Sequence, residues 1–583
     1  MHIADTNADI CVLKFGSSVL RSPSDLPDVV AEVYRHLRSG SAPVVVVSAF
    51  RGRTDQLHRL ARDVAPGSCA RSALLGSGEL EAAAAVAVAL ERSGLAAQYI
   101  EPFRIGITAS GNREESWPAT VDPQAIREAL DSHVIPVVPG YVASGEDGSP
   151  HLLGRGGSDL TAIGLGAALH AKTLLIKGSG AIYEWDPAEP GPRPKRFITL
   201  GFDDLLALGD RVVQSRAVAY AKEKQVEFTV TGLRGTDSSH IVRSTKHAKL
   251  SETDAQPTIT PRRIALFGLG VIGGGVAELL IREPTRFEVI GALVRDIGKA
   301  RAGNIGTIRI TTDVNELLEA KPDLVVEAIG GVSESFDLAL QAIRSNADYV
   351  TANKALLAKH GAQLQEVADE FGRRIIASAA VGGALPVLEL AHKAKATGSV
   401  VKVRGILNGT TNFILARHQR GHSLAEATDR ARESGYAEAD VRGDLDGTDA
   451  SQKLVLLARA LGCSLDSERD VHREPLTEST ITSRPGLLRR QVAELDLSES
   501  EPIASVRLLD LRPDDLLVVD GAGNAIEFIL EDGTTLYAQA QGAGRWPTAQ
   551  SVLADIDDLL AKADSDPTHL THATHAGLKG ASS

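Results

Sequence analysis

The sequence predicts an α/β protein made of several domains. Apolar, β-branched runs of strand length, such as residues 42–50, alternate with helical stretches from the start of the chain, and a second alternation begins at residue 264. Such runs, bounded by turn residues, indicate buried parallel strands. At roughly 100–200 residues per domain, the chain of 583 residues holds about three to five domains.

The composition argues against several classes of protein. The net charge of −13 argues against a chain that coats nucleic acid or an anionic membrane. Cys11, Cys69 and Cys463 lie far apart, so we expect no disulfide framework or zinc site, and a reducing cytoplasm fits. The longest apolar run, residues 82–90, is about half the length of a membrane span and predicts a buried helix. We therefore expect a cytoplasmic homo-oligomer with small-molecule substrates and without nucleic-acid or membrane partners.

A dinucleotide site is predicted at the start of the second half. An apolar strand ends in a GxGxxG motif, and a helical stretch follows. In this strand–turn–helix setting the glycines let backbone N–H groups approach a pyrophosphate at the helix N-terminus. The motif consists of Gly268, Gly270, Val271, Ile272 and Gly273.

The next strands supply further candidates around the cofactor. The second strand ends at Arg295, which can pair with the 2′-phosphate of NADP, whereas the neighbouring Asp296 keeps NAD open. Later strands open into Gly330 and end at Thr351. Lys354 follows, and a lysine at such a strand end can hold a substrate carboxylate or carbonyl as a point charge, although a surface lysine is the ordinary alternative.

An acidic segment precedes the helix that carries Lys453. Thr448 is the expected N-cap of this helix, and Asp449 and Lys453, four residues apart, share one helix face. A shielded lysine can take the proton of an alcohol during hydride transfer. A calcium-like acidic loop and a solvated ion pair are equally compatible with this spacing.

Six motifs, in this order, resemble homoserine dehydrogenase over about residues 262–562: GLGVIGGG, VEAIGG, VTANKALL, GILNGTTNFIL, GYAEAD…DLDGTDASQKL and QGAGRWPTAQSVLADI. That family interconverts L-homoserine and L-aspartate 4-semialdehyde with a nicotinamide cofactor. The resemblance implies that Lys453 is the acid/base and Lys354 an active-site lysine. It also implies the following substrate-side residues and a returning cofactor loop at Gly542: Asn408, Thr410, Thr411, Glu438, Asp444 and Asp449.

The resemblance further implies a structural monovalent cation, such as Na⁺, held mainly by backbone carbonyls. The corresponding turn spans residues 378–386, with Ser378, Val381 and Gly383 as the expected ligands. Ser378 stands where the family usually has glutamate.

The first half carries three small-residue turns that can expose N–H groups to phosphate oxygens. Lys14 and Arg155 can neutralise transferred charge, and phosphoryl transfer needs little beyond such positioning and magnesium. The predicted kinase site consists of Lys14, Gly16, Ser17, Ser18, Glu79, Arg155, Gly156, Gly157, Ser158 and Asp159.

Four motifs of the first half resemble aspartokinase, of the amino-acid kinase fold, over about residues 10–245. They are KFGSS, VVVVSAF…TDQL, LLGRGGSDLTA and IYEWDP. The resemblance implies ATP and Mg²⁺, with Glu79 binding aspartate. The chain departs from the family at its nucleotide-side TDVDG pattern, which reads KGSGA from Lys177, and it leaves no room between the halves for regulatory ACT modules.

The full prediction is an amino-acid-kinase-like α/β domain followed by a Rossmann domain with an α+β catalytic and dimerisation domain. The expected boundaries are residues 1–247 for the kinase-like domain, 248–262 for a linker, 263–395 for the Rossmann domain, 396–562 for the catalytic domain, whose end returns to the cofactor domain, and 563–583 for a flexible tail. The expected function is NADP-dependent homoserine dehydrogenase with an N-terminal aspartate kinase. Two alternatives stay open: a non-catalytic N-terminal scaffold, and an oxidoreductase for a related amino-acid aldehyde.

Overall fold

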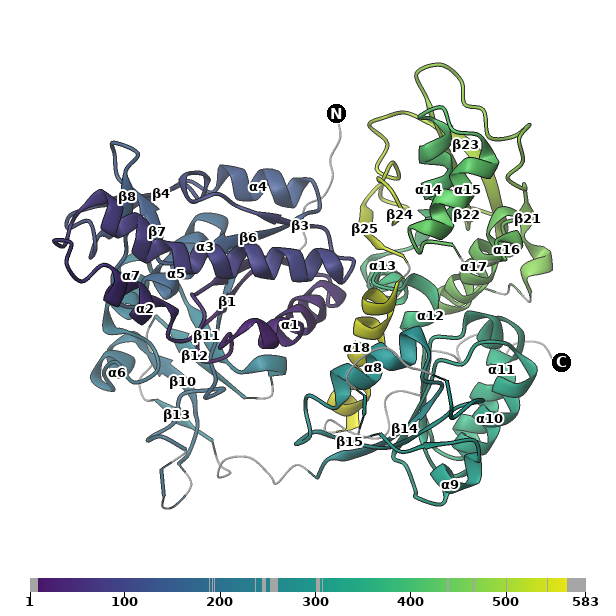
Figure 1. Cartoon of the computed structure of the whole chain (residues 1–583), viewed down its shortest axis with the longest axis horizontal. Helices are drawn as coiled ribbons and strands as arrows, with labels where there is room; N and C mark the ends of the chain where they lie inside the picture. Colours follow the sequence, from purple (N-terminus) through teal and green to yellow (C-terminus); the bar gives the residue numbers. More distant parts are fainter. Residues whose placement is uncertain are drawn as a thin grey trace. The chain divides into compact units, whose positions relative to one another are not determined.

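The computed structural model forms two compact units, one within Thr6–Arg92 and Ala96–Thr258 and the other within Ile259–Ser583 (Figure 1). The structure describes residues 9–563 except 188, 191, 193, 236, 244–247, 252–259, 300–304, 307, 438–439, 464, 466, 500 and 543. Both units are mixed α/β, which confirms the predicted fold class.

The N-terminal unit is built on a nine-stranded sheet in the order β13-β10-β12-β11-β9-β1-β2-β6-β3. Its central pairs are parallel, and β12 and β13 run antiparallel to β11 and β10. The strands are β1 (Ile10–Phe15), β2 (Ala42–Val47), β3 (Ala97–Tyr99), β6 (Ile135–Pro139), β9 (Lys172–Ile176), β10 (Phe197–Gly201), β11 (Phe228–Thr231), β12 (Ser238–Val242) and β13 (Lys249–Leu250).

A small four-stranded sheet, ordered β5-β4-β7-β8, completes the strands of this unit. Its members are β4 (Ile107–Ser110), β5 (Trp117–Val121), β7 (Val142–Ser144) and β8 (Pro150–Leu152). Helices α1 and α3 pack together, as do α5 and α7. The helices are α1 (Leu26–Arg38), α2 (Arg53–Leu60), α3 (Cys69–Arg92), α4 (Gln124–Asp131), α5 (Gly157–Leu169), α6 (Phe202–Ala207) and α7 (Ser215–Lys224).

Helix α3 contains the apolar run that the sequence predicts to be a buried helix. Among the described helices it alone has the length and apolarity that a membrane span requires, and half of its most apolar window is buried inside the unit. It packs against β2, β3, β6 and β8 and carries the buried Glu79. Helix α3 is therefore a covering helix of the sheet.

The predicted linker differs from the structure at both ends. Leu250 pairs with Phe197, so Lys249–Leu250 adds edge strand β13 to the large sheet. Arg262 is already the first residue of β14, whereas residues 252–259 lie outside the described residues. The predicted linker was too long because short polar segments at its ends pair as strands, although they show no apolar alternation in the sequence. Of the predicted tail, only Ala563, the last residue of α18, is described.

The second unit begins with a six-stranded, fully parallel sheet ordered β16-β15-β14-β17-β18-β19. The strands are β14 (Arg262–Phe267), β15 (Phe287–Leu293), β16 (Ile310–Thr311), β17 (Leu324–Glu327), β18 (Asp348–Thr351) and β19 (Ile375–Ile376). Its helices are α8 (Val271–Leu280), α9 (Val314–Leu318), α10 (Ser333–Arg344), α11 (Lys354–Glu370), α12 (Ser378–Gly382) and α13 (Val387–Thr397). The order places β14 centrally, with a neighbour on each side.

A second six-stranded sheet follows, ordered β21-β23-β22-β20-β24-β25 and mostly antiparallel. Helices α13, α14 and α17 pack on it, and the last helix, α18, returns to α8. The elements are β20 (Val400–Ile406), α14 (Gly409–His418), α15 (Leu424–Glu433), α16 (Arg442–Leu445), α17 (Thr448–Leu461), β21 (His472–Arg473), β22 (Leu488–Asp496), β23 (Ile503–Leu511), β24 (Gly523–Leu530), β25 (Thr535–Gln541) and α18 (Arg545–Ala563).

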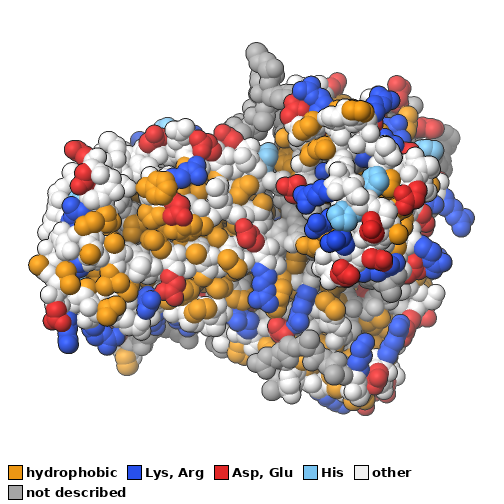
Figure 2. Space-filling model, turned by 45° about the horizontal axis from the view of Figure 1, so that its top comes forward, with side chains coloured by type: hydrophobic (Ala, Val, Ile, Leu, Met, Phe, Trp, Pro, Cys, Tyr) orange, Lys and Arg blue, Asp and Glu red, His pale blue; other side chains and the backbone are white. Residues whose placement is uncertain are grey.

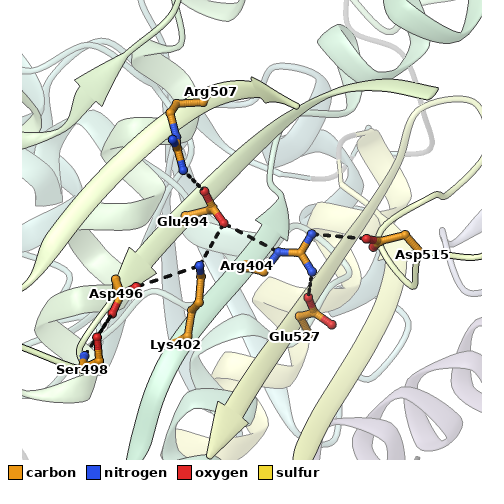
Figure 3. A network of polar contacts seen from close by, with 8 residues as sticks. All are labelled: Lys402, Arg404, Glu494, Asp496, Ser498, Arg507, Asp515 and Glu527. Carbon is orange, nitrogen blue, oxygen red and sulfur yellow. Dashed lines mark hydrogen bonds and ion pairs between the residues drawn. The ribbon is translucent and has the colours of Figure 1, made fainter. Parts of the chain in front are cut away.

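One face of this sheet is tied together by a charged network (Figure 3). Arg404 on β20 contacts Glu494 on β22 at 3.7 Å and Asp515 at 3.3 Å, and it also pairs with Glu527 on β24. The remaining members are Lys402, Asp496, Ser498 and Arg507. Opposite charges on neighbouring strands stabilise their register.

Acidic and basic side chains are mixed on the surface. On the face shown in Figure 2, Lys and Arg side chains of the described residues lie interspersed with Asp and Glu side chains.

Candidate functional site

The cofactor turn links β14 to α8, and the backbone requires glycine at two positions of the motif, Gly268 and Gly273. Gly268 has φ +98°, and a Cβ there would lie 2.8 Å from the carbonyl oxygen of Ala328. A Cβ on Gly273 would lie 2.2 Å from the carbonyl oxygen of Gly268, whereas at Gly270 it would meet open space. The open side at Gly270, the N-cap of α8, fits a pyrophosphate that approaches the backbone. Val271 and Ile272 begin the helix there.

Glu327, at the end of β17, organises the neighbouring loop and was not among the predicted residues. Its fully buried carboxylate accepts N–H bonds from Ile329 at 2.8 Å and Gly330 at 3.1 Å. Its other oxygen accepts the hydroxyl of Thr351 at 2.6 Å. Thr351 therefore shapes the Gly330 loop through Glu327. An acid closing an otherwise apolar strand was the available signal.

Arg295 lies two residues after β15 and is paired at the surface. Its Nη2 lies 2.6 Å from Oε2 of Glu334 in the first turn of α10, and the two side chains are 73% and 57% exposed. Asp296 closes the following turn, since its Oδ1 accepts the N–H of Gly298 at 2.8 Å. Arg295 therefore follows the carboxyl end of β15 and is ion-paired there, and its contact with a cofactor stays a prediction.

Two predicted lysines meet on one carboxylate. Lys453 Nζ lies 2.9 Å from Oδ2 of Asp449, and Lys354 Nζ lies 2.8 Å from Oδ1. Helices α11 and α17, which carry them, pack against each other. Lys453 also donates to the carbonyl of Leu407 at 2.6 Å. Asp449 thus fixes both lysines in one place, which a solvated surface pair would not do.

Asn408 extends this group to a second acid. Its Nδ2 donates to Asp444 at 2.7 Å and to Asp449 at 2.9 Å, while its Oδ1 accepts the N–H of Thr411 at 2.9 Å. Burial raises the pKa of Asp444. Burial also acts on Asp449, but the ammonium groups of Lys453 and Lys354 outweigh it and hold the pKa of Asp449 well below its usual range. We call these five residues the Asp449 cluster: Lys354, Asn408, Asp444, Asp449 and Lys453.

The other substrate-side predictions fall around this cluster. Thr410 donates its hydroxyl to the carbonyl of Tyr436 at 2.7 Å, and Thr411 donates to Gln491 at 3.0 Å. Both threonines therefore hold the start of α14, while Glu438 lies outside the described residues.

The predicted N-cap of the Lys453 helix was wrong by one position. Gly447, at φ +80°, is the N-cap of α17 and Thr448 is its first residue. The N–H of Thr448 donates to Asp446 at 2.9 Å, so an aspartate before the glycine satisfies a helix-end donor instead of the threonine hydroxyl.

The cation and loop predictions concern two other segments. Ser378 opens the short helix α12, Val381 lies within it, and Gly383 follows at φ +62°. Near the helix start, the carboxylate of Asp555 accepts the N–H of Ala379 at 3.2 Å. The monovalent cation stays a prediction. Gly542 follows β25, and its missing Cβ leaves the space that the amide of Asn524 fills.

The N-terminal unit holds a comparable group at the ends of its central strands. Lys14, the fifth residue of β1, lies 2.7 Å from Asp159 near the start of α5. Lys177, directly after the neighbouring β9, lies 2.8 Å from the other oxygen of Asp159. We call Lys14, Asp159 and Lys177 the Asp159 cluster. Burial lowers the pKa of Lys14 to about 8, and the two lysines hold the pKa of Asp159 at about 2 against its burial. Lys177 was not predicted, because its role needs the parallel pairing of β1 and β9.

Glu79 is a buried carboxyl on α3. Its Oε1 accepts the N–H of Ala49 at 3.4 Å, and its Oε2 has no hydrogen-bond partner among the described residues. Burial raises the pKa of Glu79 to about 8. A buried oxygen without a partner is costly for the protein alone and is suited to a cationic group of a ligand.

The remaining kinase-site predictions lie on the turns around the Asp159 cluster. Gly156, at φ +75°, caps α5, and Gly157 is its first residue. Ser18 accepts the N–H of Gly178 at 3.0 Å, which joins the turns after β1 and β9. Gly16 and Ser158 are buried, whereas Ser17 and Arg155 are exposed.

Glu79 makes the stability of the N-terminal unit depend on pH. Its native pKa of about 8 lies above its ordinary value of 4.5, so the unfolded chain loses this proton first and stability falls as pH rises from about 4.5 towards 8. We expect Glu79→Gln to raise the melting temperature relative to wild type at pH 8 more than at pH 5, by roughly 2–4 °C per kcal/mol. Thermal unfolding of the full chain measures this, with the exposed Glu91→Gln on the same helix as control. An equal shift at both pH values would contradict the role of Glu79.

Comparisons with known proteins match three successive parts of the chain to family models. The amino acid kinase family matches residues 9–231, the NAD binding domain of homoserine dehydrogenase matches 268–378, and homoserine dehydrogenase matches 386–556. Homoserine dehydrogenase from Synechocystis sp. is 31% identical over 52% of this chain and 75% of its own length, and that from Pseudomonas aeruginosa is 34% identical over 53% and 74%. The crystal structure of a homoserine dehydrogenase from Thiobacillus denitrificans is 30% identical, covers 54% of this chain and 77% of that one, and has a TM-score of 0.49.

Proposed function

Because the chain belongs to the homoserine dehydrogenase family and carries an amino acid kinase domain ahead of it, we propose that it interconverts L-homoserine and L-aspartate 4-semialdehyde. The observation that carries the proposal is the Asp449 cluster, in which two lysines share one carboxylate that is 13% exposed. A related amino-acid aldehyde as substrate is the alternative. Assays of the full chain that compare homoserine with related amino-acid alcohols distinguish the two.

Each residue of the Asp449 cluster has a separate role in the proposed reaction. A nicotinamide cofactor, when bound, exchanges hydride with the carbon that carries the hydroxyl. Lys453 takes the hydroxyl proton in oxidation and returns it in reduction. Asp449 keeps one ammonium partner, Lys354, when Lys453 is neutral, so proton transfer leaves no unpaired buried charge. Asp444 is held by Asn408 and offers its carboxylate to the substrate ammonium.

We propose NADP as the preferred cofactor because Arg295 follows β15, the strand whose end is expected to face the adenosine ribose in this fold. A guanidinium gives charge-assisted hydrogen bonds to a 2′-phosphate that the 2′-hydroxyl of NAD cannot replace. Arg295→Ala is expected to raise KM for NADP about tenfold or more and to change KM for NAD little. Steady-state kinetics with each cofactor measures this, and equal effects on both would contradict the proposal.

For the N-terminal unit we propose phosphorylation of L-aspartate by ATP. Lys14 and Lys177 place two positive charges at neighbouring strand ends, as transferred phosphoryl oxygens require. The unpartnered oxygen of Glu79 suits the ammonium group of aspartate. Asp159 is engaged by both lysines, so Mg²⁺ would arrive with the ATP phosphates rather than be held by this acid.

One preparation of the full chain tests both activities. One assay measures the homoserine-dependent reduction of NADP. A second assay on the same preparation measures the aspartate-dependent hydrolysis of MgATP or the transfer of its γ-phosphoryl group. Dehydrogenase activity without any aspartate-dependent ATP turnover would favour the non-catalytic scaffold for the N-terminal unit. Cytoplasmic location and homo-oligomeric assembly stay predictions that fractionation and light scattering test.

A further inference from the structure

The ion pair between Arg295 and Glu334 spans the cofactor turn. In the sheet, β14 lies between β15 and β17, and the three strands are parallel. Arg295 follows β15, whereas Glu334 belongs to the helix that follows β17. A contact between them therefore joins the two sides of the Gly268–Gly270 turn, at the edge where parallel strands of this fold bind their ligands.

We propose that Glu334 is a specificity-determining residue that holds Arg295 in the cofactor-free protein and must release it to a 2′-phosphate. The 2.6 Å contact occupies Nη2 of Arg295, one of the donors that a phosphate would need. The inference deepens the proposed function and rests on it, because it assumes that Arg295 faces the 2′ position of the cofactor.

The charges make the effect selective for the phosphorylated ligand. A 2′-phosphate must displace the carboxylate of Glu334 from Arg295 and then stands near it as a like charge. A 2′-hydroxyl carries no charge, so it neither has to displace the carboxylate of Glu334 nor is repelled by it. Glu334 therefore weakens binding of NADP more than binding of NAD. It thereby reduces the preference for NADP over NAD that Arg295 provides. Both side chains are more than half exposed, so solvent screening limits the effect.

The test uses two fragments of the cofactor, adenosine 2′,5′-bisphosphate and adenosine 5′-monophosphate, in calorimetric titrations of the full chain. We expect Glu334→Gln to tighten binding of the bisphosphate by about three- to tenfold and to change binding of the monophosphate by less than about twofold. Unchanged or equally changed affinities for the two fragments would overturn the inference.

The matched control is another exposed ion pair of the same domain. Arg309 Nη2 lies 2.6 Å from Oε2 of Glu316, with side chains 61% and 44% exposed, and Arg309 precedes β16, which pairs with the last residues of β15. Glu316→Gln should leave both affinities unchanged. If it shifts the bisphosphate affinity as strongly as Glu334→Gln, the effect reflects overall charge and the inference fails.

Combination with Arg295→Ala separates this inference from the proposed function. If Glu334 acts by holding Arg295, Glu334→Gln gains little in the Arg295→Ala background, and a full gain there would overturn the release mechanism. If Arg295→Ala weakens both fragments equally, the NADP proposal fails. If Arg295→Ala is selective and Glu334→Gln is not, only the inference about Glu334 fails.

Discussion

Replacing Lys453 by alanine is expected to lower kcat for homoserine oxidation by about 10²–10⁴-fold, the usual contribution of a general base. Lys453 is the less exposed of the two lysines on Asp449, with 12% of its side chain exposed against 36% for Lys354, and it is held further by the carbonyl of Leu407. Its position is thus fixed by two bonds, as proton transfer in a defined direction requires. KM for homoserine should change little.

The fold should survive this substitution because Asp449 keeps Lys354 as its partner. Lys359→Ala, at an exposed position on α11, is the control for the loss of one positive charge. The pH profile of kcat adds a second readout, since the limb that reports deprotonation of the base should disappear. A nearly normal kcat with a raised KM would instead assign Lys453 to substrate binding.

Sequence patterns predicted those parts of the site whose residues lie within one short segment of the chain. The glycine turn after β14 was predictable because its glycines act within one short segment, as the clash between a Gly273 Cβ and the Gly268 carbonyl shows. The pairing of Asp449 with Lys453 followed from helical periodicity. The arrival of Lys354 on the same carboxylate depends on the packing of α11 against α17, and spacing in the sequence carries no information about it.

The residues that were missed are those whose partners come from another strand. Glu327 is a lone acid in the sequence, and its role appears only when β17 and β18 bring Thr351 beside it. Lys177 stood out only as a departure from a family pattern, until the pairing of β1 with β9 placed it opposite Lys14 on Asp159. The edge strand β13 was missed because two residues carry no periodic pattern.

Replacing Lys14 by alanine is expected to lower aspartate-dependent ATP turnover by about 10²–10³-fold, the scale for loss of one preorganised donor to a developing charge. Lys14 is 5% exposed, and burial lowers its pKa to about 8 while Asp159 acts to raise it. Its ammonium form is therefore maintained at neutral pH inside the protein, where its charge is weakly screened.

The dehydrogenase of the same molecule is the internal control for folding, since Lys14→Ala should leave its kcat unchanged. Lys172→Ala removes an exposed lysine at the other end of β9 from Lys177, and it should leave both activities unchanged. Lys177→Ala should reduce ATP turnover less than Lys14→Ala, because Lys177 stands beyond the end of its strand and is more exposed, at 13% against 6% of the side chain. If Lys14→Ala and Lys177→Ala both leave the ATP turnover at its wild-type value, the Asp159 cluster only holds strands together, and the N-terminal unit carries no phosphoryl transfer at this site.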